Sequence, residues 1–202
     1  GKFIMNKPND FDNVQAYGEF TPLKLGGQIC KIMQVKETQS KTGKDMLEIS
    51  IDIAEGDQKD YFANQYRSDT RQNKKWGCII YQLVKDAQGN TNKGFKTFVT
   101  SVEHSNPGFK VVWGDNFAAC FKGKLIGGVF GREEYLNANN EKKFATKCVY
   151  FRSVEAIRAG VEVPEDKLLP ESVVSPSNAS NDIGDGFMNI PDGLDEELPF
   201  FN

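Results

Sequence analysis

The chain has 202 residues with 25 basic and 28 acidic side chains, which gives a net charge of -3 at pH 7. This length accommodates one domain, or one domain and a tail. No apolar run approaches the ~20 residues that a membrane-spanning helix needs. The N-terminal stretch also lacks the apolar core and the cleavage site of a secretory signal. We therefore expect a cytoplasmic protein.

Few side chains suit catalysis or metal binding. His104 is the only histidine, and the four cysteines, at positions 30, 78, 120 and 148, form no CxxC pair. This spacing argues against a zinc ribbon. It is typical of free thiols in a reducing compartment, with two disulfides in a secreted protein as the alternative.

Two enzyme classes lack their motifs. Neither Gly43-Lys44 nor Gly123-Lys124 has the upstream glycine and the following Ser or Thr of a phosphate-binding loop. Acidic neighbours such as Glu133 and Glu134 have no lysine at a recognisable nuclease spacing. We expect a protein that is not an enzyme and that holds no metal or cofactor.

Charge divides the chain in two. Residues 1–160 carry a net charge of +6 and residues 161–202 a net charge of -9, and five of the eight prolines lie in the second part. A segment rich in Ser, Asn and Asp buries too little apolar area to offset the entropy lost on ordering. We predict a basic domain over residues 1–160 and an acidic, disordered tail over residues 161–202.

The first half of the domain reads as strands. Residues 27–38 are rich in β formers, residues 39–45 form a polar turn, and residues 46–54 alternate. The alternation places Leu47 and Ile49 on a buried face, and Glu48, Ser50 and Asp52 on a solvent face. Residues 59–66 are predicted as a third strand.

The middle of the chain reads as helical, and the end of the domain as a hairpin. Trp76, Ile79, Ile80, Leu83 and Val84 recur at helical spacing, as do the apolar residues of 95–102, and a short helical turn is expected at 115–121. Strands are predicted at 123–135 and 142–154. Broken alternation near Lys31 and Gly127-Gly128 indicates bulges.

The order of these elements predicts the fold class. Three strands, a helical insertion at about 68–122 and two further strands follow the element order of an OB-fold, a mainly β five-stranded barrel. The insertion of about 50 residues exceeds the single helix that such a barrel needs, so the match is partial.

Lysines and aromatic residues are interleaved in a way that suits a single-strand binder, which combines cations for phosphates with rings for bases. The helical period of Trp76, Phe95 and Phe98 favours a core role for these rings. Phe130, Tyr135 and Tyr150 fit the core and the surface equally well. The candidate DNA contacts are Lys36, Lys41, Lys44, Tyr66, Arg67, Arg71, Lys74, Lys75, Lys122, Lys124, Phe130, Arg132, Tyr135, Lys142, Lys143, Lys147, Tyr150 and Arg152.

The C-terminus has the form of a docking peptide. An acidic cluster precedes Leu-Pro-Phe, so that a basic pocket could receive the carboxylates and an apolar pocket the ring. The alternative is a solvated acidic tail with no partner. The candidate partner-binding residues are Asp195, Glu196, Glu197, Leu198, Pro199 and Phe200.

Two resemblances follow from these residues. The stretch 195–200 resembles the acidic tail tip of bacterial single-stranded DNA-binding proteins, which recruits replication and repair enzymes; here Phe201 and Asn202 follow the Pro-Phe pair. Segments 41–49, 52–56, 123–127 and 132–135 resemble small phage proteins encoded in replication and recombination modules, over about residues 20–155. The resemblances imply an OB-fold DNA-binding role without catalysis.

We therefore expect a protein that binds single-stranded DNA in phage or mobile-element replication, recombination or repair, acts in the bacterial host cytoplasm, and recruits partners through its tail. One alternative is a replisome adaptor that does not bind DNA. Another is a strand-annealing recombination protein. A homo-oligomer is compatible with all three.

Overall fold

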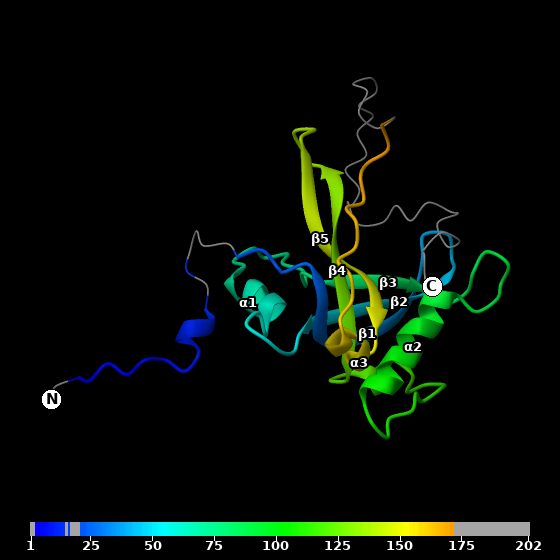
Figure 1. Ribbon diagram of the computed structural model, residues 1–202, viewed down its shortest axis with the longest axis horizontal. Coiled ribbons are helices and arrows are strands. Elements are labelled where there is room, and N and C mark those ends of the chain that lie inside the picture. The colour runs from blue at the N-terminus through cyan, green and yellow to red at the C-terminus, as the bar shows by residue number, and fades with distance from the viewer. Residues whose placement is uncertain (1–2, 15, 17–20, 172–202) are drawn as a thin grey trace.

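The structure is a computed structural model that describes residues 3–14, 16 and 21–171 (Figure 1). Within this part of the chain, no helix is long and apolar enough to cross a membrane. The elements in chain order are η1 (Phe11–Asn13), β1 (Gly26–Gln39), β2 (Asp45–Ile53), α1 (Tyr61–Ser68), β3 (Ile79–Leu83), α2 (Lys93–Ser105), η2 (Ala118–Phe121), β4 (Leu125–Leu136), β5 (Lys142–Arg152) and α3 (Val154–Ala159).

The five strands form one antiparallel sheet in the order β3-β2-β1-β4-β5. The central strand β1 pairs with β2 along one edge and with β4 along the other. The outermost strands are β3 and β5, and no ladder joins them within the described residues, so the sheet is not closed into a barrel. The prediction of a mainly β fold with five strands is confirmed, whereas the expected closure is not observed.

The segment between β2 and α2 differs from its prediction. Residues 59–66, predicted as a strand, contain most of helix α1. Asp52, buried near the end of β2, accepts hydrogen bonds from the N–H groups of Phe62 (2.8 Å) and Ala63 (3.0 Å). A helix start leaves four N–H groups without partners. The Asp52 carboxylate satisfies two of them, and this tertiary contact outweighs the β propensity of the aromatic residues.

The third strand, β3, lies inside the stretch predicted as helical. Ile79, Ile80 and Leu83 fit a helical spacing, but a short apolar run cannot distinguish a helix from a buried strand. The free edge of β2 decides the outcome, because Ile79 pairs with Ser50 and Ile80 with Ile49. The predicted helical insertion at 68–122 is therefore wrong in extent, since α2 and η2 alone lie between the third and fourth strands.

The predicted helix at 95–102 and the turn at 115–121 correspond to α2 and η2, whereas η1 and α3 were not predicted and α3 begins at Val154, which was predicted as the end of a strand. Phe98 and Val102 of α2 are fully buried in the core. The ring of Phe98 lies 4.9 Å from that of Phe121 in η2 and 5.4 Å from that of Phe151 in β5. Bulges occur in β1 after Ile32 and in the β4–β5 ladder, next to the two predicted positions.

β4 and β5 continue beyond the rest of the sheet as an arm (Figure 1). The first residue of β1, Gly26, pairs with Phe130, so the β4 residues that follow have β5 as their strand partner. The arm comprises 131–136 of β4, 142–147 of β5 and the turn between them.

Residues 164–169, predicted as part of the tail, run along the β4 edge of this arm, and we name them the strap. Lys167 N–H donates to Arg132 O (2.9 Å), and Glu134 N–H donates to Lys167 O (2.8 Å). Leu169 N–H donates to the Glu134 carboxylate (3.0 Å). The strap therefore occupies backbone positions on β4 that β1 leaves unpaired.

Candidate nucleic-acid interface

The bulge in β1 shapes the outer face of the sheet. Ile32 pairs with Ile51 and Gln34 with Ser50, so Met33 is an extra residue. Because Ile32 and Val35 are both buried, Met33 and Gln34 lie together on the outer face. A bulge commonly redirects a side chain in this way, and here it places a thioether beside an amide.

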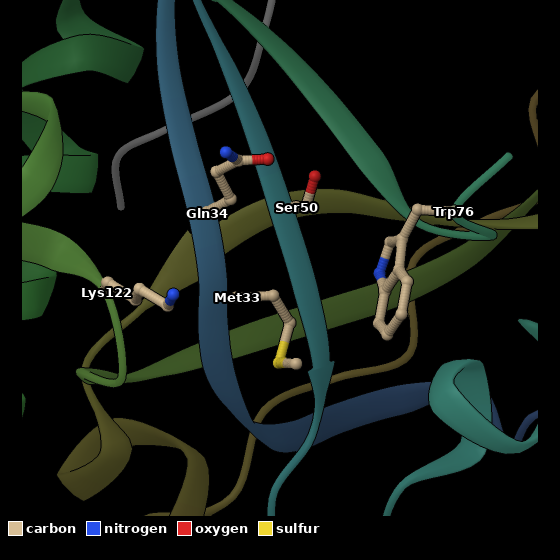
Figure 2. A pocket seen from close by; sticks show the side chains of 5 residues that line it. All are labelled: Met33, Gln34, Ser50, Trp76 and Lys122. Atoms are coloured by element: carbon tan, nitrogen blue, oxygen red, sulfur yellow. The ribbon is translucent and has the colours of Figure 1, made fainter.

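These side chains line a surface depression of ≈ 290 Å³, which we name the β1–β2 groove. Figure 2 shows Met33, Gln34 and Ser50 on the strands, with Trp76 on one flank and Lys122 on the other. The Trp76 indole N–H donates to Ile51 O at 2.7 Å, which fixes the orientation of the ring. The groove thus combines an aromatic ring, a thioether, neutral hydrogen-bonding groups and a cation.

A second ring extends the aromatic wall of the groove. The ring of Tyr66, at the end of α1, lies 5.7 Å from the Trp76 ring at an interplanar angle of 41°. The Lys74 ammonium lies 4.3 Å from the centre of the Tyr66 ring and donates to Tyr66 O at 3.1 Å. Two rings and a cation of the kind that binds single strands are therefore adjacent here.

Many of the predicted DNA-contacting cations have carboxylate partners. Pairs in which both side chains are exposed contribute little to stability, so a phosphate could replace the carboxylate there. The Glu134 carboxylate of the Lys142 pair is buried. In the pair nearest to α1, a hydrogen bond from Arg71 lowers the pKa of Asp69 to about 2. The pairs are Lys36–Glu48 (3.8 Å), Arg71–Asp69 (2.7 Å), Lys142–Glu134 (3.7 Å), Lys143–Glu141 (3.8 Å), Lys147–Glu133 (3.2 Å) and Arg132–Asp166.

The predicted cations occupy three regions, apart from Lys36, which lies in β1. Lys41 and Lys44 lie in the turn between β1 and β2, and the arm projects from the sheet with its own set (Figure 1). The structure brings Lys74 and Lys122 to the β1–β2 groove but does not gather all eighteen candidates into one track. The members near α1 and η2 are Arg67, Arg71, Lys74, Lys75, Lys122 and Lys124, and those of β4 and β5 are Arg132, Lys142, Lys143, Lys147 and Arg152.

The aromatic candidates for DNA contact differ in how deeply their rings are buried. Phe130 is fully buried, so its prediction as a DNA contact is wrong. Tyr135, on the arm, is 45% exposed. Tyr150 is half-buried, with the Arg152 guanidinium 4.5 Å from the centre of its ring. Only Tyr66, Tyr135 and Tyr150 of the predicted rings can therefore reach a ligand.

Sequence reasoning missed four residues of the groove. The helical spacing of Trp76 with Ile79 and Ile80 predicts a core role; no helix forms there, but the ring is partly buried and packs against the core as well as lining the groove. Taken one at a time, Met33, Gln34 and Ser50 belong to no sequence pattern that marks a binding residue. The apolar residues Ile32 and Val35, three apart in a strand, require a bulge between them, and this spacing could have located the groove.

The groups suited to catalysis are not gathered in the described part of the chain. No set of three or more His, Cys, Asp or Glu side chains there is placed to hold a metal ion. All four cysteines are free thiols, and burial raises the pKa of Cys30, Cys78 and Cys148. These three thiols therefore stay protonated and unreactive at neutral pH.

The predicted docking tip, residues 195–200, lies outside the described residues. Comparison with known proteins finds no relative, since neither a family model nor a curated protein matches the chain.

Proposed function

We propose that this protein binds single-stranded DNA without catalysis, with the β1–β2 groove as the site of one base. The observation that carries the proposal is the pairing of Trp76 with Lys122 across Met33 on an outer sheet face (Figure 2). An indole held by its own hydrogen bond can stack a base without first being ordered. Gln34 and Ser50 can hydrogen-bond to the edge of the base, and Lys122 can contact a phosphate.

The architecture of the sheet supports the proposal of an OB-type fold. OB-folds are five-stranded, partly open barrels that bind oligonucleotides on the face of strands 2 and 3 and at nearby loops. The groove lies on β1 and β2, next to the start of β3, and a helical segment separates β3 from β4. We therefore propose that the open five-stranded sheet is of the OB type, as the sequence predicts.

The role in the cell follows from the resemblances. A protein that coats DNA during phage or mobile-element replication, recombination or repair must also bring enzymes to that DNA. We propose that the tip at 195–200 recruits such partners through its carboxylates and Phe200, as in the proteins whose tail it resembles.

The proposal is tested by titrating the full chain into labelled oligo-dT at two salt concentrations. We expect affinity to fall steeply with salt, because phosphate contacts release counterions. Trp76→Ala should weaken binding between about five- and 150-fold, since each stacked base contributes roughly 1–3 kcal/mol. Lys122→Ala should lower the slope of log K against log[salt] by about 0.7, the value for one phosphate of a single strand.

Lys85→Ala provides the matched control. Ile79 starts β3 beside Ser50 of the groove, whereas Lys85 follows the far end of the strand. At ~3.3 Å per residue, six residues place Lys85 ~20 Å from the groove. Its removal should leave the salt slope unchanged. A wild-type chain without saturable binding, or equal affinities of all four proteins, would refute the proposal.

A further inference from the structure

We infer a second base-stacking platform at Trp113, in the loop between α2 and η2, an inference that rests on the proposed function. Trp113 is 65% exposed, more than any other aromatic residue outside the N-terminal segment among the described residues. Sequence reasoning did not single it out. Its ligand would be a nucleobase of the same single strand that occupies the β1–β2 groove.

The packing behind Trp113 is that of a platform. Its ring stacks on the buried ring of Phe117 at 5.1 Å, with an angle of 16° between the planes. The ring of Phe95, also buried, lies 6.4 Å away at an angle of 63°. One indole face is thus backed by the core, and the exposed area belongs to the rest of the ring. A base can stack there without ordering the side chain first.

The loop that carries the ring is also anchored. Val111 N–H donates to the Glu103 carboxylate of α2 at 3.0 Å, and the Lys110 ammonium lies 3.3 Å from the same carboxylate. Phe117 leads directly into η2. Trp113 is therefore held from both sides, by contacts to α2 before it and by a stacked ring after it.

The platform lies close to the groove along the chain. Phe117 precedes η2 and Lys122 follows it, and a 3₁₀ helix rises ~2 Å per residue, so their backbones are ~10 Å apart. Phosphates in one strand of B-DNA are ~3.4 Å apart along the axis. The backbone of Phe117, on whose ring Trp113 stacks, is therefore about three nucleotides away from Lys122.

The chemistry favours a base over a protein partner. A protein-binding hot spot is surrounded by other contacts that exclude water, and Val112 is the neighbouring large apolar side chain that is exposed. A base needs only one ring face. Trp113 itself carries no charge, so what its ring adds is stacking and not a phosphate contact.

The neutral ring gives the platform its own signature. Trp113→Ala in the full chain should weaken binding of oligo-dT of ~16 nucleotides between about five- and 150-fold, with no change in the salt slope. Binding of a dinucleotide, which fills the groove but is too short to extend to Trp113, should not change. Trp113→Phe retains a ring and should lose less affinity than Trp113→Ala.

A second measurement uses the intact platform. The chain has two tryptophans, so Trp76→Phe leaves Trp113 as the sole indole emitter, and the long oligonucleotide should quench its fluorescence. Unchanged emission at saturation would overturn the inference, as would equal loss for both lengths in Trp113→Ala. If the wild type binds neither length, the proposed function fails as well. If it binds both and Trp113→Ala binds equally, only the platform fails, and a protein partner becomes the favoured occupant.

Discussion

The carboxylate of Asp52 links the sheet to the segment that carries Trp76. It is 1% exposed and accepts hydrogen bonds from the N–H groups of Ile53, Phe62 and Ala63. Burial raises its pKa, although these three bonds oppose the shift. An acid whose pKa is higher in the folded state binds its proton more tightly there than in the unfolded chain.

This shift gives a prediction for stability against pH. The stabilisation from protonated Asp52 is fully present below the unfolded pKa of about 3.9. It is lost as pH rises through the raised folded value. Relative to Asp52→Asn, the wild type should therefore lose unfolding free energy as pH rises above about 4. Urea unfolding of both proteins across this range measures the difference, and a constant difference would contradict the assignment.

Asp52 also shows what the hydrophobic alternation of a strand does not predict. Alternation places Asp52 on a solvent face with Glu48 and Ser50, and this is wrong for Asp52, which is 1% exposed. What covers a face is not encoded in the strand that forms it. Helix α1 covers Asp52, whereas Ser50 lines the groove.

At the scale of elements, helix α2 depends on one cap. The Asn92 side-chain oxygen accepts hydrogen bonds from Gly94 N–H (2.8 Å), Phe95 N–H (3.4 Å) and the Gln82 amide of β3 (2.9 Å). It therefore closes the helix start and ties that start to the sheet edge. Phe95, which supports Trp113, is the third residue of the helix.

Asn92→Ala should lower the unfolding free energy by about 1–2 kcal/mol, because it removes an N-cap that also serves a third donor. Asn92→Asp keeps an oxygen acceptor for the same donors and should stay within about 0.5 kcal/mol of the wild type. Chemical denaturation of the three proteins measures both changes. Equal losses in the two variants would show that the cap contributes nothing.

The elements differ in how far the sequence predicts them. The alternation of β2 and the Asn-rich turn between β4 and β5 are local signals, and both were read correctly. The stretch 59–84 was not, because α1 depends on a carboxylate from β2 and β3 depends on the free edge of β2. The wrong prediction for this stretch also affects the candidate site, since Trp76 lies between α1 and β3.

At the scale of the whole molecule, the folded body extends past residue 160, where the sequence predicts that a disordered tail begins. Val161 and Val163 lie against Gly27 and Gly26, where an added Cβ would meet them at 2.7 and 3.3 Å. The strap then pairs with β4, and Asp166 forms an ion pair with Arg132. Residues 161–169 thus contribute to the folded body.

Two shortened chains test this. A chain of residues 1–171 should keep the unfolding free energy of the full chain. A chain of residues 1–160 should lose about 2 kcal/mol or more, since it lacks two backbone hydrogen bonds of about 1 kcal/mol each and the contacts of Val161 and Val163 with the start of β1. It also leaves β4 positions open to strand addition. Denaturation and light scattering compare the two, and indistinguishable chains would contradict the packing role.

The strap also fixes where the last 31 residues leave the domain, beside the arm. A chain of that length spans at most ~100–110 Å when fully extended. Under the proposed function, an enzyme held at Phe200 would therefore stay within that radius of the strap. Its effective concentration there would be set by the geometry of the tether, and lengthening or shortening the tether would change it without altering any contact.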